Sequence, residues 1–171
     1  MIARNAGLSL LVLCAGSLLH CGDLTAPEPD GPPFMSATIA FAPWRVDSTS
    51  SSGALAAALF SGSGLALDGS EYRRRCPCRV ILVYVQQIAA GGRYRLGDTT
   101  STAFAGYQFT DSTYTHHLAF TTSRMHGGEL AVASLDTVRH LVTGTFFFDA
   151  EQNSGSTVIH IRDGRFRVIY P

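Results

Sequence analysis

Closely spaced glycines are the sequence feature that most constrains how this chain can fold. From residue 62 onward they interrupt short apolar runs, at Gly62, Gly64, Gly69, Gly91, Gly92, Gly97, Gly106, Gly127, Gly128, Gly144, Gly155 and Gly164. Turns between strands favour glycine and helix interiors do not, and no long segment keeps the roughly 3.6-residue apolar period of a helix. The pattern therefore predicts an all-β, antiparallel domain.

The runs between these glycines predict about ten strands. They cover residues 34–41, 54–60, 65–68, 79–88, 93–96, 103–110, 114–121, 129–135 and 141–150, followed by a final hairpin. The alanine-rich run 54–60 would also suit a helix, but it is so short between two glycines that a strand is favoured. This number of strands fits a β-sandwich or a barrel-like fold, since each hides sheet edges.

Two strand patterns are specific enough to predict pairing. Residues 79–88 are apolar on both faces, which predicts a central strand whose second face is covered by another layer, a loop, a partner or a ligand. The Asp163-Gly164 pair is the signal of a two-residue hairpin turn. It predicts that Ile161 opposes Phe166 on the core face, with His160 beside Arg167 on the solvent face.

The start of the chain has the pattern of an export signal. Arg4 precedes an apolar run that is long enough for a secretory signal and too short to span a bilayer. The sequence Leu-Leu-His-Cys at 18–21 is similar to a lipobox, although His20 stands where a small residue is usual. We expect residues 1–20 to be a lipoprotein-type signal peptide and Cys21 to be lipidated. Cleavage by the ordinary signal peptidase is the alternative.

Composition sets the remaining organisation. Residues 21–33 contain four prolines and favour an extended tether, and residues 34–171 are expected to form one all-β domain. All thirteen basic residues are arginine and are balanced by thirteen acids, so no global field attracts nucleic acid. The absence of lysine excludes Schiff-base chemistry. The expected location is the cell envelope, with the domain anchored on the periplasmic side or the outer surface.

The most unusual segment joins arginines to a pair of cysteines, in the order Arg73, Arg74, Arg75, Cys76, Pro77, Cys78 and Arg79. In an oxidising compartment Cys76 and Cys78 fit a local disulfide. Reduced or intermolecularly paired thiols are the second interpretation, and redox or metal chemistry is the third. The four arginines fit either a solvated hairpin end or a patch for an anionic glycan or lipid headgroup.

No residue cluster indicates catalysis or metal binding. His116 and His117 are adjacent, so on a strand they point to opposite faces, and at most one of them can join a site with His126. The sequence has no nucleophile elbow, no HExxH motif and no phosphate-binding loop, and its carboxylates are scattered singly. We therefore expect no enzyme activity, no metal and no cofactor.

Five motifs occur in a characteristic order. They are FMSATI at 34–39 with Trp44 nearby, GRYRL at 92–96, GGEL at 127–130 leading to Leu135 and Asp136, VTGTFFF at 142–148, and residues 158–168 around Asp163-Gly164. Together they resemble a family of small bacterial lipoproteins of unknown function. The resemblance implies export and an all-β fold, and it supplies no catalytic residues. Pro43 departs from the family pattern, in which a turn glycine is usual.

These observations predict an uncharacterised lipoprotein of the cell envelope that acts as a non-enzymatic binding or interaction module. Its expected contacts are the membrane, through the anchor at Cys21, and a small apolar molecule, a glycan or an envelope protein, but not nucleic acid. A structural envelope spacer is one alternative. A thiol-active protein that uses Cys76 and Cys78 is the other.

Overall fold

A computed structural model of the chain describes residues 31–48, 53–60, 64–71, 78–97, 102–113 and 115–171, with only the backbone for 53–60. These residues form eleven strands and no helix, which confirms the all-β prediction. The strands are β1 (Phe34–Ile39), β2 (Ala42–Asp47), β3 (Gly53–Phe60), β4 (Gly64–Glu71), β5 (Cys78–Val85), β6 (Arg93–Leu96), β7 (Ala103–Thr110), β8 (His117–Thr121), β9 (Gly128–Asp136), β10 (Leu141–Gln152) and β11 (Val158–Ile169). The expected signal peptide, and the tether up to residue 30, lie outside the described residues.

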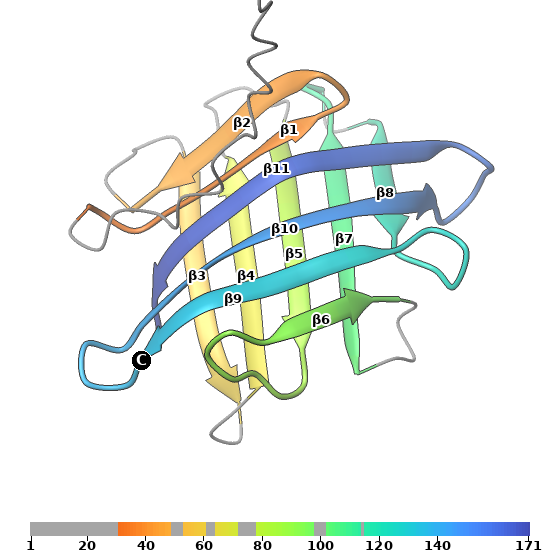
Figure 1. Cartoon of the computed structure of the whole chain (residues 1–171). Helices are drawn as coiled ribbons and strands as arrows, with labels where there is room; N and C mark the ends of the chain where they lie inside the picture. The colour runs from red at the N-terminus through yellow and green to blue at the C-terminus, as the bar shows by residue number, and fades with distance from the viewer. Residues whose placement is uncertain (1–30, 49–52, 61–63, 72–77, 98–101, 114) are drawn as a thin grey trace, which may run out of the picture.

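The strands form one strongly curled sheet. Its main path runs β2-β1-β11-β10-β8-β7-β5-β4-β3 through antiparallel ladders. The long strand β10 is the branch point, because β9 pairs with its first part, β8 pairs with its last two residues, and β6 continues from β9. The result is a half-barrel with a front layer, β2-β1-β11-β10-β9-β6, that crosses a back layer, β8-β7-β5-β4-β3 (Figure 1).

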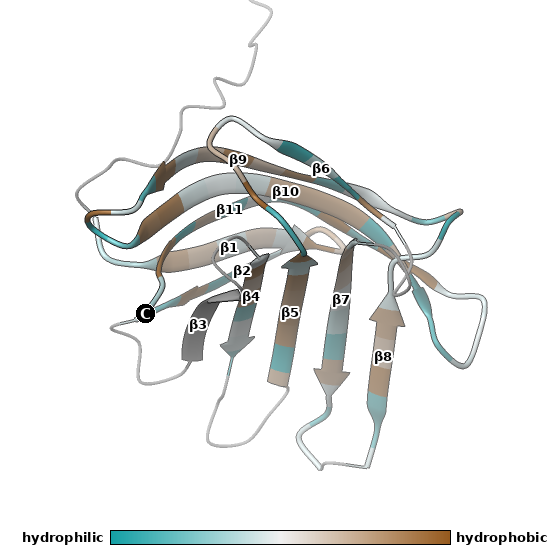
Figure 2. Cartoon of the chain, turned by 90° about the horizontal axis from the view of Figure 1, so that it is seen from below, coloured by the Kyte–Doolittle hydropathy of each residue, from teal (hydrophilic) through white to brown (hydrophobic). Residues whose placement is uncertain are grey.

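The front layer arches over the back strands (Figure 2). The buried apolar side chains of both layers form one hydrophobic core. Phe148, Phe166, Met35, Leu67 and Ile81 are among its fully buried side chains. Gly69 of β4 gives room for the indole of Trp44, since a Cβ at position 69 would lie 2.6 Å from it. Glycine at this position therefore lets β2 pack closely against the back layer.

Strand β5 is central in the back layer, as its apolar sequence predicts, with β4 on one side and β7 on the other. Ile81 and Val83 face the core and are fully buried. Val80, Leu82 and Tyr84 alternate with them, face outward and are half-buried. The apolar second face of this strand therefore belongs to the outer surface of the back layer.

The predicted final hairpin is wrong. Residues 158–169 form a single strand, β11, which pairs with β10 on one side and β1 on the other. Asp163 has a φ of +52° and lies in a β-bulge, where Phe146 pairs with Gly164 and Phe148 pairs with Ile161. An Asp-Gly pair satisfies the positive φ of a bulge as well as that of a turn. The Asp163-Gly164 pair therefore marks a bulge inside one strand and not the two-residue turn that the sequence predicts.

A tight turn ends the first strand earlier than predicted. The sequence favours a strand through Phe41, whereas β1 ends at Ile39 and β2 begins at Ala42. Ala40 and Phe41 between them have φ values of +46° and +71°, as a type I′ turn requires. Neither is glycine, asparagine or aspartate, so the usual composition of such a turn is missing. For this reason the sequence does not reveal β2.

Candidate functional site

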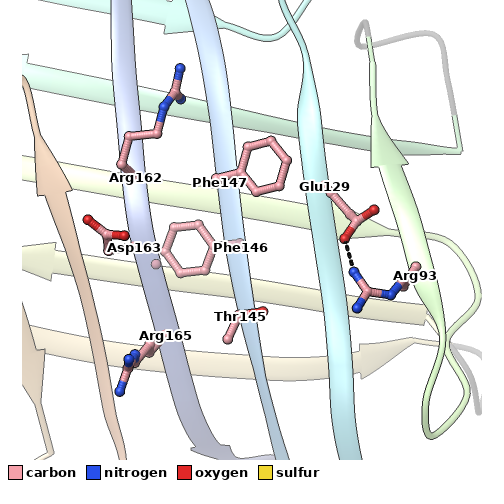
Figure 3. A pocket seen from close by; sticks show the side chains of 9 residues that line it. Arg93, Glu129, Thr145, Phe146, Phe147, Arg162, Asp163 and Arg165 are labelled. Atoms are coloured by element: carbon pink, nitrogen blue, oxygen red, sulfur yellow. Dashed lines mark hydrogen bonds and ion pairs between the residues drawn. The ribbon is translucent and has the colours of Figure 1, made fainter. Parts of the chain in front are cut away.

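A hollow on the outer face of the front layer is the candidate site. It encloses about 290 Å³, close to the lower end of the range of roughly 300–1,000 Å³ that is typical of small-molecule sites. It lies over β6, β9, β10 and β11, and its lining is Arg93, Glu129, Thr145, Phe146, Phe147, Arg162, Asp163, Gly164 and Arg165 (Figure 3). Four strands from distant parts of the sequence therefore build one surface.

The β-bulge of β11 shapes this hollow. Two residues of β11, Arg162 and Asp163, stand opposite the single residue Phe147 of β10. A bulge bends its strand and redirects the neighbouring side chains. Phe147 lies on the face of β10 opposite the buried Phe146 and Phe148, and its side chain is 47 % exposed. The bulge therefore leaves an aromatic ring accessible beside several charged groups.

Two of the arginines in the hollow are already paired. Arg93 Nη1 lies 2.5 Å from Glu129 Oε1, and Arg162 Nη2 lies 2.5 Å from Asp149 Oδ1. The same Asp149 oxygen is 2.7 Å from His160 Nδ1. Burial raises the pKa of the Asp149 carboxyl, but hydrogen bonds with His160 and Arg162 outweigh it and hold that pKa below the ordinary value. Asp149 is therefore ionised at neutral pH and forms an ion pair with Arg162.

Arg165 differs from these two arginines. Its half-buried guanidinium has no acidic partner within the described part of the chain. It lies at the edge of the hollow, next to Thr145 of β10 in the ladder. An arginine in this state offers a planar set of donors to a carboxylate, phosphate or sulfate group.

The arrangement suits binding of a ligand that has both a polar rim and an apolar face. Phe147 can cover an apolar ring, Glu129 can accept a hydrogen bond from a hydroxyl group, and Arg165 can bind an anionic group. Among the described residues, no set of three or more His, Cys, Asp and Glu side chains is placed to hold a metal ion.

Most of the residues that the sequence singled out cannot be compared with this hollow. Cys21, Arg73, Arg74, Arg75 and Cys76 lie outside the described residues. Lipidation at Cys21 and the arginine patch therefore stay predictions.

Cys78 and Arg79 are described, and both lie at the start of β5. Cys78 is disulfide-bonded, and the other three cysteines of the chain lie outside the described residues, so pairing with Cys76 also stays a prediction. Arg79 Nε lies 2.7 Å from Glu71 Oε2, its neighbour in the β4–β5 ladder. Burial raises the pKa of the nearby Tyr107 to about 12, although Arg79 partly opposes this rise. These groups form a second polar cluster, separate from the hollow.

The predicted neighbour of His160 is wrong. His160 lies beside Asp149 and Arg162, not beside Arg167 as the hairpin register predicts. Arg167 is buried on the front layer and pairs with Thr143 in the ladder. His117 Nδ1 is 2.9 Å from the hydroxyl of Thr110.

Sequence reasoning missed the residues of the hollow, Phe147 and Arg165 above all. Their only local signal is an Asp-Gly pair inside a strand that otherwise alternates, opposite a run of three phenylalanines in β10. Placing β6 beside β9 requires the long-range order of strands, which that signal does not contain.

Comparisons with known proteins place the chain in a family without assigning it an activity. No helix in the described segments is both long and apolar enough to cross a membrane. Searches of curated proteins and of solved structures find no match. A family model described as a domain of unknown function, DUF6252, matches residues 57–169, which is more than half of the chain. The chain therefore belongs to the family of the domain of unknown function DUF6252.

Proposed function

We propose that this protein is a non-enzymatic binding module of the cell envelope and that the hollow on its front layer binds an acidic glycan. One observation carries the proposal: Arg165, a cation without an acidic partner in the described residues, and the half-exposed ring of Phe147 line the same hollow. Folding alone gives no reason to place both groups at one surface hollow.

Each chemical group of an acidic sugar has a matching side chain in the hollow. Its carboxylate would pair with Arg165, and the apolar face of its ring would lie against Phe147. Its hydroxyl groups would donate to Glu129, whose carboxylate is oriented by Arg93. A small apolar ligand would leave these charges unused, so the glycan is favoured over it.

The location supports the same function. A lipid anchor at Cys21 and a proline-rich tether would hold the domain near the membrane, within reach of envelope polysaccharides. A structural spacer is the second candidate, but it gives no role to the exposed Phe147. A thiol-active protein using Cys76 and Cys78 is the third, but Cys78 is disulfide-bonded and does not line the hollow.

Calorimetric titration of the full chain with an oligogalacturonate tests the binding role, and a neutral galactose oligomer of the same length is the comparison. We expect the acidic oligomer to bind and the neutral one to bind at least tenfold more weakly, a difference of about 1.4 kcal/mol. Arg165→Gln and Phe147→Ala should each weaken binding of the acidic oligomer. Arg139→Gln and Ile169→Ala, which alter exposed groups outside the hollow, are the matched controls. Equal binding of both oligomers, or no binding at all, would contradict the proposal.

Intact mass spectrometry of the protein extracted from membranes tests the location. The expected product lacks residues 1–20 and carries an acylglyceryl group on Cys21. Cys21→Ser should release the protein from the membrane fraction. An unacylated wild-type chain in the soluble fraction would refute the anchor and leave the binding role to be judged by the titration.

A further inference from the structure

The tip of the β1–β2 turn presents an exposed aromatic side chain on an unfavourable backbone. Phe41 is 97 % exposed, and its φ is +71°. Glycine or asparagine normally occupies such a position, because a bulky side chain is strained at positive φ. Folding therefore gains nothing from this side chain and is hindered by its backbone geometry.

The backbone at the base of this turn is anchored by hydrogen bonds. Ile39 and Ala42 form the last pair of the β1–β2 ladder, directly below the turn. The backbone N–H of Ala40 donates to the carbonyl of His160 in β11, at 3.1 Å. The base of the turn is thus tied to two neighbouring strands, and the turn lies at the end of the β1–β2 hairpin (Figure 1).

An apolar groove of the size of a phenyl ring lies on the outer face of the back layer. It encloses about 130 Å³, and its walls include Leu82, Phe104 and Ala119. Gly106 forms its floor, between Leu82 of β5 and Thr121 of β8 in the ladders. A Cβ at position 106 would meet only the carbonyl oxygen of Phe120, at 3.2 Å, so the missing side chain leaves the space above the strand open.

The dimensions of the groove fit one phenyl ring. An apolar protein cavity of about 150 Å³ is large enough to hold benzene. Phe41 does not fill the groove of its own chain, because its side chain is almost fully exposed. We infer that Phe41 of one copy of this protein inserts into the Gly106 groove of a second copy.

The projecting ring and the groove are different surfaces of the same chain, so each copy can give one contact and receive another, either reciprocally in a two-fold dimer or head to tail. Half-buried apolar side chains around the groove, Val80 and Tyr84, would extend the contact. The area of one ring in one groove is small compared with the roughly 800 Å² per partner of a standard interface, so we expect weak association at high local concentration.

Photo-cross-linking between isotopically distinct copies tests the inference. The full chain, made in ¹⁴N medium with p-azidophenylalanine in place of Phe41, is mixed with unmodified ¹⁵N full chain and illuminated. Mass spectrometry of the digest then identifies the joined peptides. The control carries the same probe in place of Val138, which is 89 % exposed in the β9–β10 turn. We expect mixed-isotope products from position 41 to residues 80–84 or 102–121, and none above background from position 138.

Two changes in the ¹⁵N acceptor fill the groove from different strands. Gly106→Val and Ala119→Leu should each lower the yield of this cross-link about tenfold, and circular dichroism verifies that the acceptor is folded. Using two positions keeps the test valid if one substitution disturbs the sheet. The inference is overturned by products that join other regions, by same-isotope or lipid products alone, by no product, or by unchanged yields with both folded acceptors.

Discussion

In β10 of the front layer the outward-facing side chains include Thr145, Phe147 and Asp149, whereas in β5 of the back layer they are Val80, Leu82 and Tyr84. Both strands bury their inward faces in the same core. On the front layer, ion pairs surround one exposed aromatic ring. On the back layer, Tyr84 and Phe104 pack with their ring centroids 5.2 Å apart. A shared core therefore supports two outer faces of opposite chemistry, each suited to a different kind of contact.

The sharpest test of inner against outer faces uses two neighbouring residues of β10. Phe148→Ala removes a fully buried ring and should lower the free energy of unfolding by about 3–5 kcal/mol. Phe147→Ala removes a ring on the opposite face and should cost less than about 1 kcal/mol. Urea unfolding measures both. Equal losses would show that Phe147 is also part of the core and would remove the front hollow from consideration.

Two glycines extend the same comparison to the back layer. Gly69→Val places its side chain against Trp44 and Met35 in the core and should destabilise the fold by about 1–3 kcal/mol. Gly106→Val points outward from β7, and we expect a change within about 1 kcal/mol. Thermal unfolding compares the two variants. If Gly106→Val proves the more damaging, the outer face of the back layer is as tightly packed as the core.

The charges of the front face should make stability depend on pH. The folded-state pKa of Asp149 is lowered, so its contribution to stability is complete above the ordinary carboxyl pKa of about 4 and is lost as pH falls through the folded-state value. Asp149→Asn should therefore be less stable than the wild type at pH 6, and this difference should shrink in acid. Unfolding curves between pH 2 and pH 6 measure it. A difference that stays constant over this range would mean that the ion pair with Arg162 is not formed in solution.

The smallest expected effect is a gain in stability. Phe41→Gly removes the strain of a bulky residue at positive φ and should raise the free energy of unfolding by about 0.5–1 kcal/mol. Val138→Gly is the matched control. Val138 is exposed in a turn but its φ is not positive, so the glycine relieves no strain there and should not stabilise the fold. A loss of stability in Phe41→Gly would show that the ring of Phe41 makes folding contacts within its own chain.

Local patterns predicted the strands well, because alternation and glycine spacing are properties of short segments. The run 54–60 is a strand despite its alanines, and β5 is central as its apolar pattern indicates. The errors arose where one local signal fits two structures. The Asp-Gly pair of β11 forms a bulge instead of a turn, and the turn at Ala40 and Phe41 lacks the residues that usually mark one.

The candidate site could not be predicted in the same way. Its parts come from three consecutive strands, β9, β10 and β11, and from the more distant β6, whose pairing with β9 is not contained in any local pattern. Arg165 looks like any solvent-facing residue of an alternating strand. Only the neighbouring strands show that acids pair with Arg93 and Arg162, whereas Arg165 has no acidic partner in the described segments.

The branch at β10 has a mechanical consequence. In the described residues the layers share backbone bridges at two places: β8 pairs with Glu151 and Gln152 at the end of β10, and Gly97 forms a single bridge with Phe104. A force that separates the layers would act first on these few backbone bridges and would leave the long ladders within each layer intact. Under such a force the protein would open between the front and back layers, and each layer would move as a rigid unit.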